Sequence, residues 1–138
     1  MKVVHLVQFF EPGYAGGIQH YVGELAGCQQ SIGLDVSVLT LTLPRGHLNG
    51  NGAVHRPRGN GAVPVLARRS WGVFHRVPIY PSIVADVRRL DADVVHLHGP
   101  SPWFEAALML AFPTKGRLVF TIHNTLPRTT RVQRRLGW

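Results

Sequence analysis

The order strand, glycine-rich turn, helix, strand at the start of the chain constrains the fold more than any other feature. Apolar runs of strand length occupy residues 3–10 and 36–43. Between them, apolar side chains recur at the spacing of one helix face, at Ile18, Tyr21, Val22, Leu25 and Ala26. Gly33 supplies a stop for this helix. The pattern predicts a parallel βαβ unit with a right-handed crossover.

The same alternation continues along the chain. Strands are predicted at residues 65–67, 94–98 and 118–123, and helices at residues 82–90 and 103–112. Ser101 is a good N-cap for the second of these helices, with Pro102 as its first residue. A stripe within it is predicted to be core, namely Trp103, Phe104, Leu108 and Met109. We expect one α/β domain over residues 1–138, with a Rossmann-like, doubly wound parallel sheet.

Residues 44–64 interrupt this pattern. They are rich in Gly, Asn, Arg, His and Pro, and residues 50–54 recur as residues 59–63. Two short copies are too few for a repeat architecture. We expect a long mobile surface loop, and both a functional and a disordered segment remain open.

The chain is basic, with 15 Lys and Arg residues against 7 Asp and Glu residues and a net charge of +8. Basic surfaces attract phosphate on nucleic acid, anionic lipid or a sugar nucleotide. Nucleic acid is not an expected partner, because the sequence has no recognition-helix, RNA-stacking or zinc motif. The tail after residue 125 mixes apolar residues with Arg128, Arg131, Arg134 and Arg135. It is interpreted as a helix that packs on protein or, alternatively, as a basic amphipathic helix on a membrane surface.

The cellular setting follows from two features. No run approaches the ~20 apolar residues that cross a bilayer. Cys28 is the single cysteine, which excludes an intrachain disulfide and fits a reducing cytosol. We expect its thiol to be structural and at least half buried. A cytoplasmic protein is predicted, with contact at the inner face of the membrane as the alternative that the basic tail leaves open.

Three strand ends carry polar or glycine-rich sequence. Gly16 and Gly17 follow the first strand, His98 ends the strand at 94–98, and His123 and Asn124 follow the last strand. In open α/β sheets, ligands bind beyond the carboxyl ends of the strands, so these groups are expected to line one crevice. The glycine pair permits close approach of a phosphate or sugar to a helix N-terminus. A tight turn that needs positive φ is the structural alternative for the pair.

The histidines raise the question of a metal. His96 and His98 point to the same side of a strand, and His123 is a conceivable third ligand. No Asp, Glu or Cys lies at matching spacing, so no metal site is predicted. His96 is expected to be a hydrogen-bonded core histidine, whereas His98 and His123 are better placed for contact with a ligand.

Five stretches in order resemble the N-terminal half of glycosyltransferase family 4, which has the GT-B architecture. They are Val3-Val4-His5-Leu6-Val7 with Phe10-Glu11-Pro12, then Gly16-Gly17-Ile18-Gln19, Gly33-Leu34-Asp35-Val36, Asp93-Val94-Val95-His96-Leu97-His98-Gly99-Pro100, and Val119-Phe120-Thr121-Ile122-His123-Asn124-Thr125. The third departs from the family's Gly-His-Glu-Val. Nothing in the chain matches the family's C-terminal donor domain.

The resemblance implies a retaining, metal-independent transfer of a sugar from a nucleotide-sugar donor to a glycan, lipid or small-molecule acceptor. No cofactor is implied, because the nucleotide sugar is a substrate. His98 is implied as the catalytic residue that reaches the transferred sugar, and Gly16 and Gly17 as the loop beside the donor diphosphate. Tyr14, His123 and Asn124 are implied on the acceptor side.

The same resemblance implies that activity needs a C-terminal donor domain, supplied in cis or in trans. A non-catalytic partner or binding module, or a truncated remnant of such an enzyme, is the alternative from a different functional class.

Overall fold

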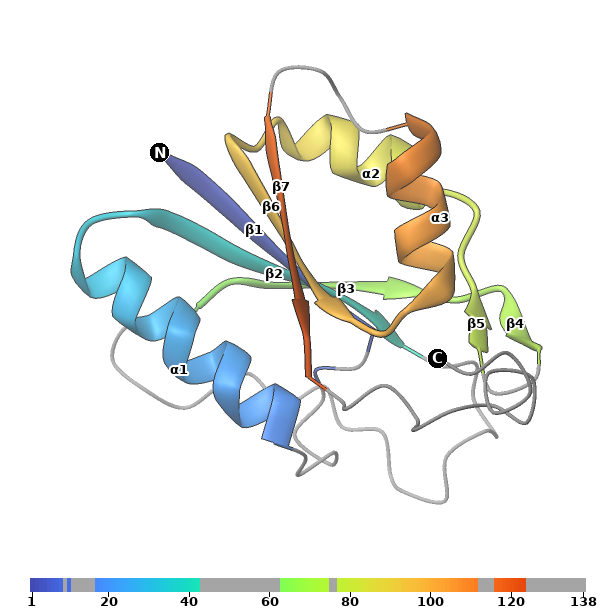
Figure 1. Ribbon diagram of the computed structural model, residues 1–138, viewed down its shortest axis with the longest axis horizontal. Coiled ribbons are helices and arrows are strands. Elements are labelled where there is room, and N and C mark those ends of the chain that lie inside the picture. The colour runs from blue at the N-terminus through green and yellow to red at the C-terminus, as the bar shows by residue number, and fades with distance from the viewer. Residues whose placement is uncertain (9, 11–16, 43–62, 75–76, 112–115, 124–138) are drawn as a thin grey trace, which may run out of the picture.

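The computed structural model describes residues 1–8, 10, 17–42, 63–74, 77–111 and 116–123. Strands and helices alternate along most of the chain (Figure 1). The elements are β1 (Lys2–Val7), α1 (Gly17–Ser31), β2 (Asp35–Thr42), β3 (Val65–Arg69), β4 (Gly72–Phe74), β5 (Val77–Ile79), α2 (Ile83–Leu90), β6 (Val94–Gly99), α3 (Pro102–Ala111) and β7 (Arg117–Ile122).

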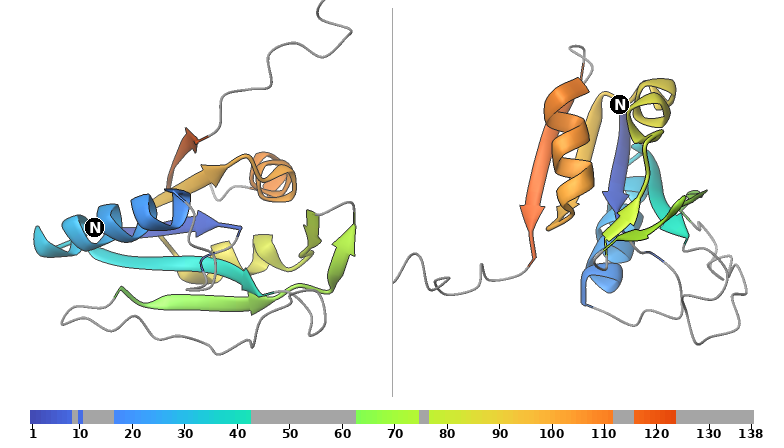
Figure 2. Two further views of the ribbon diagram at one scale, coloured as in Figure 1. Left: turned by 90° about the horizontal axis from the view of Figure 1, so that it is seen from below. Right: turned by 90° about the vertical axis from the view of Figure 1, so that its right-hand side faces the viewer.

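Five of the strands form one parallel sheet in the order β3-β2-β1-β6-β7. The chain moves outward from β1 through β2 to β3 and then returns to β6 on the other side of β1, so β7 and β3 form the two edges (Figure 2). The predicted α/β, Rossmann-like parallel sheet is confirmed. The strand order reverses between β1 and β6, and this switch point is where such sheets place a ligand crevice.

The strands are nearly continuous apolar runs because helices cover both faces of the sheet. On one face, α1 packs Val22 and Ala26 against a cluster from β1 and β2. On the other face, α2 and α3 pack against a second cluster, to which they contribute Ile83, Val87, Phe104 and Leu108. The two clusters lie on opposite sides of the strands because successive residues of a strand face opposite ways.

The structure adds one element that the sequence analysis did not predict. The strands β4 and β5 pair antiparallel as a separate two-stranded sheet. Each strand has only three residues, Gly-Val-Phe and Val-Pro-Ile, and each includes a residue type that is depleted in strands, so the sequence carries no clear strand signal here. The third predicted strand is also longer than expected, since β3 extends to Arg69.

Three predictions about side-chain burial are wrong. Tyr21 belongs to the apolar stripe of α1 that is expected to face the core, but it is 45% exposed. Phe104 and Leu108 are buried as expected, but Met109 is 84% exposed. Position 109 lies five residues after Phe104, which turns it well away from the buried face of a helix with 3.6 residues per turn. Cys28 is exposed on α1 and does not lie in the core.

Some predictions fall outside the described residues. These include Tyr14, Gly16, Asn124, the tail from residue 126 and most of the loop predicted at 44–64. Of that loop, Val63 packs against the α1-side cluster, and the Pro64 carbonyl accepts a hydrogen bond from the Val38 N–H at 2.9 Å. Within the described ranges, no helix is both long enough and apolar enough to cross a bilayer.

The end of β6 is a crowded turn into α3. The Ser101 N–H donates to Glu105 Oε1 at 2.9 Å, and the Glu105 N–H donates to the Ser101 carbonyl at 3.0 Å. A Cβ atom added to Gly99 would lie 2.7 Å from Phe120 Cζ and 3.0 Å from Glu105 Oε1. Because Gly99 has no side chain, the Phe120 ring on β7 can lie directly against the backbone of β6.

We expect Gly99→Ala to lower the free energy of unfolding by ~1–3 kcal/mol, the usual cost of overpacking. The double variant Gly99→Ala/Phe120→Ala should recover part of this loss, because the clashing ring is gone. Urea denaturation of the four members of the cycle measures both effects. Additive losses in the double variant would contradict the proposed clash.

Candidate functional site

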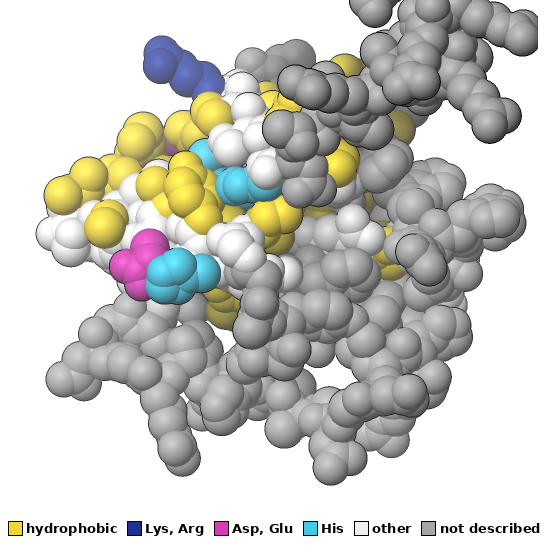
Figure 3. Space-filling model, turned by 60° about the horizontal axis from the view of Figure 1, so that its bottom comes forward, with side chains coloured by type: hydrophobic (Ala, Val, Ile, Leu, Met, Phe, Trp, Pro, Cys, Tyr) yellow, Lys and Arg dark blue, Asp and Glu magenta, His cyan; other side chains and the backbone are white. Residues whose placement is uncertain are grey.

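Four histidines gather on the α1 face of the sheet, around the switch point. His5 is on β1, His96 and His98 are on β6, and His123 follows β7. His5 pairs in register with His96, and His98 pairs with Thr121. Register partners on parallel strands share a face, and residues two apart share it as well. The four imidazoles therefore point to the same side, and histidine reaches the surface amid mainly hydrophobic and uncharged side chains (Figure 3).

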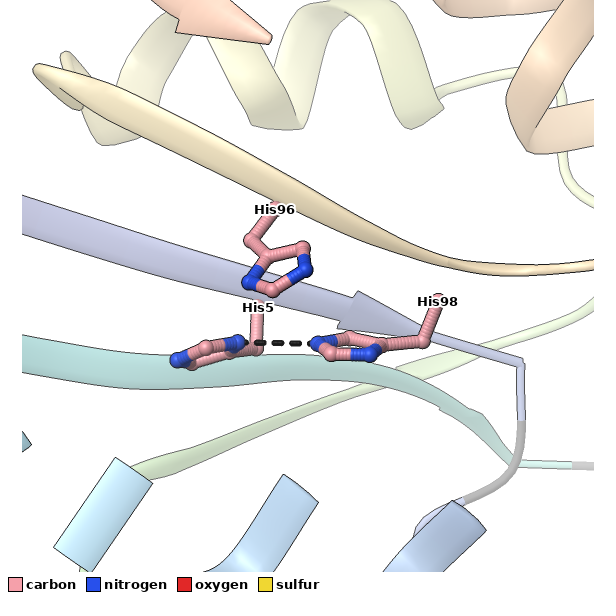
Figure 4. Close-up of side chains that lie close together, drawn as sticks. All are labelled: His5, His96 and His98. Atoms are coloured by element: carbon pink, nitrogen blue, oxygen red, sulfur yellow. Dashed lines mark hydrogen bonds between the residues drawn. The ribbon is translucent and has the colours of Figure 1, made fainter. Parts of the chain in front are cut away.

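Three of these imidazoles form a hydrogen-bonded chain that begins on α1. His5 Nε2 lies 2.7 Å from Gln29 Oε1, and His5 Nδ1 lies 2.9 Å from His98 Nε2 (Figure 4). His98 Nδ1 lies 2.9 Å from His123 Nε2. Both ring nitrogens of His98 are thus held, and its ring orientation is fixed from two sides.

His96 lies beside this chain and is not a link in it. Its Nε2 is 2.8 Å from Thr121 Oγ1 on β7. Its ring centroid lies 4.1 Å from that of His98, and Figure 4 shows its ring next to the His5–His98 hydrogen bond. His96 is 9% exposed. The prediction of a hydrogen-bonded core histidine is confirmed for this residue.

Burial keeps the imidazoles of His5, His96 and His98 neutral. His5 and His98 are buried, and desolvation disfavours the charged form. Burial, together with the neighbouring imidazoles His96, His5 and His123, lowers the pKa of His98 to about 3. Burial, His5 and His123 lower the pKa of His96 to about 4. Burial also lowers the pKa of His5, against a smaller opposing effect of Gln29. At neutral pH each of these rings carries one proton.

The chain reaches the surface through His123. This residue is only partly buried, and the exposed Tyr21 of α1 packs edge-on against it with ring centroids 5.0 Å apart. Tyr21 also packs edge-on against His98 at 6.1 Å. The structure therefore brings the predicted site residues His98 and His123 together, with His123 outermost.

Gly17 is the first residue of α1, one helical turn before Tyr21, and the start of this helix lies close to the carboxyl end of β7 (Figure 1). Among the described residues, positive φ is found at Gly33 and Asp91 and not at Gly17. A Cβ atom added to Gly17 would meet nothing within 4 Å. Neither backbone strain nor crowding thus demands glycine at this position, so the tight-turn interpretation is wrong for Gly17.

The histidines also bear on the question of a metal. One ligand nitrogen from each of His5, His96 and His98 lies within 4.8 Å of the others. Buried neutral imidazoles suit Zn²⁺ or Cu²⁺. The third histidine of this group is His5, whereas His123 was the third ligand considered from the sequence. However, His5 Nδ1 and His98 Nε2 already share a hydrogen bond, so a metal would have to displace the proton between them.

The sequence analysis missed His5 and Gln29 as site residues. Residues 3–7 read Val-Val-His-Leu-Val and residues 94–98 read Val-Val-His-Leu-His. These strings are paired residue by residue between β1 and β6. The match between these two segments, both predicted as parallel strands, is the signal from which His5 could have been predicted as a site residue. No comparable signal existed for Gln29.

The model of the family described as Glycosyltransferase Family 4 matches residues 15–138. This match covers α1 and every later element, including the residues of the histidine chain other than His5. No curated protein matches the chain.

Lowering the pH is expected to destabilise the fold. In the unfolded chain an imidazole takes up a proton near pH 6.5, whereas folded His96 does so near pH 4. The free energy of unfolding is therefore highest above pH 6.5. It falls as the pH drops from about 6.5 toward 4, by ~1.4 kcal/mol per pH unit for each histidine that the folded chain keeps uncharged. Urea denaturation at pH 7, 6 and 5 measures this slope. The slope should be shallower in His96→Asn, and an equal slope in both proteins would contradict the lowered pKa.

Proposed function

The chain belongs to glycosyltransferase family 4, and on that premise we propose that it forms the acceptor-side half of a retaining glycosyltransferase. The reaction would move a sugar from a nucleotide-sugar donor to an acceptor with retention of the anomeric configuration. The observation that carries the proposal is the paired arrangement of His98 and His123 beside the first turn of α1, at the carboxyl end of the sheet.

The start of α1 suits the donor diphosphate. The first N–H groups of a helix lack partners within the helix and attract anions. Gly17 has room for a side chain, since an added Cβ atom would meet nothing within 4 Å, and Gly16 precedes it. Negative charge grows on the leaving diphosphate in the transition state, so fixed N–H donors there would lower the barrier.

The imidazoles suit the sugar. The pair leaves one ring nitrogen of His123 outside the hydrogen bonds within the chain, and a hydroxyl group can either donate to or accept from such a nitrogen. We assign His98 to the transferred sugar at the reaction centre, where it acts through its hydrogen bond to His123 because both of its ring nitrogens are already engaged. His123, Tyr14 and Asn124 are assigned to the side of a glycan, lipid or small-molecule acceptor. The reaction in this proposal is cytoplasmic and needs no metal or other cofactor, and residues 126–138 are assigned a peripheral membrane contact.

The proposal includes a second domain that binds the donor nucleotide, in the same polypeptide or in a partner. A surface suited to such contact exists on β7, the edge strand. Leu118, Val119, Phe120 and Ile122 are each 41–49% exposed, although they alternate between the two faces of the strand. This apolar edge equally supports the second candidate function, a non-catalytic module that pairs with another protein.

The intact mass of the native gene product separates these two cases. A mass of roughly 40 kDa is expected if a donor domain follows in the same polypeptide. A mass close to that of the 138 residues would favour the partner module, and co-purification of a separate donor-domain protein would then decide whether it supports catalysis.

In the complete transferase, we expect His98→Ala to lower kcat by ~100-fold or more, because His123 would lose the hydrogen bond that orients it at the reaction centre. Release of nucleoside diphosphate from a panel of nucleotide sugars, without added metal and with a chelator present, provides the assay. The matched control is His20→Ala, because His20 is an exposed histidine of α1 outside the hydrogen-bonded chain. Unchanged turnover in His98→Ala would remove His98 from the catalytic role, and loss of activity with the chelator would contradict the metal-independent mechanism.

A further inference from the structure

We infer that Gln29 sets, through His5, which ring nitrogen of His98 and of His123 carries the proton, so that the site presents His123 Nδ1 as a hydrogen-bond acceptor for a hydroxyl group of its ligand. Gln29 and His5 are then positioning residues that act through His98. The assignment of the hydroxyl to a sugar or an acceptor rests on the proposed function, whereas the proton arrangement itself does not.

The first bond of the chain sets its direction. Gln29 Oε1 is a carbonyl oxygen and only accepts, so His5 Nε2, at 2.7 Å, must donate. A neutral imidazole has one N–H, which leaves His5 Nδ1 as an acceptor. Because His98 Nε2 lies 2.9 Å from that atom, it must be the donor in this second bond.

The same reasoning gives the donor and the acceptor of the outer hydrogen bond, between His98 and His123. With its proton on Nε2, His98 has an unprotonated Nδ1, and this atom accepts the third bond from His123 Nε2 at 2.9 Å. His123 is left with Nδ1 as its acceptor atom. These bond directions require neutral rings, since an imidazolium donates from both nitrogens and would break the sequence of bonds. The lowered pKa values of His5 and His98 meet this requirement for the two inner rings, and the measurement of the tautomers below tests it for His123.

The position of Gln29 on α1 supports a specific role. Val22 and Ala26 form the buried face of the helix, and position 29 lies on the same face, three residues after Ala26 and seven after Val22. An apolar side chain is the usual occupant of such a position. Here a polar amide occupies it and accepts a hydrogen bond from His5.

The inferred arrangement has a chemical consequence for the ligand. An unprotonated Nδ1 accepts a hydrogen bond from an O–H group but repels the oxygen of a phosphate or carboxylate, which can only accept. The His123 end of the site would therefore select a hydroxyl of the sugar or acceptor and would leave anionic oxygens to the start of α1.

The test is to determine the imidazole tautomers in the 138-residue chain. Proton–nitrogen correlation spectra of ¹⁵N-histidine-labelled protein at pH 7 distinguish a protonated from an unprotonated ring nitrogen. In the wild-type chain, His5, His98 and His123 are expected to carry the proton on Nε2. In Gln29→Lys, the ammonium group only donates, so His5 must accept at Nε2, and His98 is expected to switch its proton to Nδ1. The control Gln30→Lys adds the same charge at the neighbouring position and should leave all three tautomers unchanged.

Two results would overturn the inference. One is a wild-type His98 with its proton on Nδ1, and the other is the same His98 tautomer in wild type and in Gln29→Lys. If Gln29→Lys fails to fold, as judged by its amide spectrum, the wild-type tautomers still decide the direction of the chain. Neither measurement needs a sugar donor or any turnover, so absence of transferase activity would count against the proposed function alone.

Discussion

The pairing of β1 with β6 is the contact on which the rest of the site depends. These strands are more than 80 residues apart in sequence, and their parallel register puts His5 next to His96 and brings His98 within 2.9 Å of His5. Slipping the register by one residue would turn the imidazoles of one strand toward the opposite face, where α2 and α3 pack. The apolar residues of β1 and β6 fix the register, because they must face the two hydrophobic clusters on either side of the sheet.

Much of the fold could be predicted because its pattern is local. The spacing of apolar residues in α1, the Ser101-Pro102 helix start and the continuous apolar strands each depend on neighbours in sequence, and each appears in the structure. The features that were not predicted depend on contacts that the local sequence pattern does not reveal. The exposure of Met109 follows from which helix face α3 turns to the sheet, and the β4–β5 hairpin consists of strands too short for a clear periodic signal.

The residues of the candidate site likewise include some that could be predicted from the sequence and some that could not. His98 could be singled out because it ends a predicted strand, and His123 because it follows one, and both lie where parallel sheets bind ligands. His5 sits in the middle of β1 and looked like part of an apolar run, although it is the link between α1 and His98. Gln29 could not be found from the sequence, since its role arises only when α1 packs across β1. The family match over residues 15–138 assigns the chain to glycosyltransferase family 4, which the geometry alone does not.

The hydrogen-bonded histidines also give the carboxyl edge of the sheet an electrical asymmetry without any formal charge. In the inferred arrangement every N–H of the chain points away from the surface and toward Gln29, so the bond dipoles add and their negative end lies at His123. The first turn of α1, which carries the positive end of a helix dipole, is the neighbouring feature, in contact through Tyr21. Fields that arise from partly buried dipoles are screened far less by dissolved ions than surface charges are. Under the proposed function, the orientation of a ligand at this edge would therefore persist at ionic strengths that weaken attraction to the basic groups elsewhere on the chain.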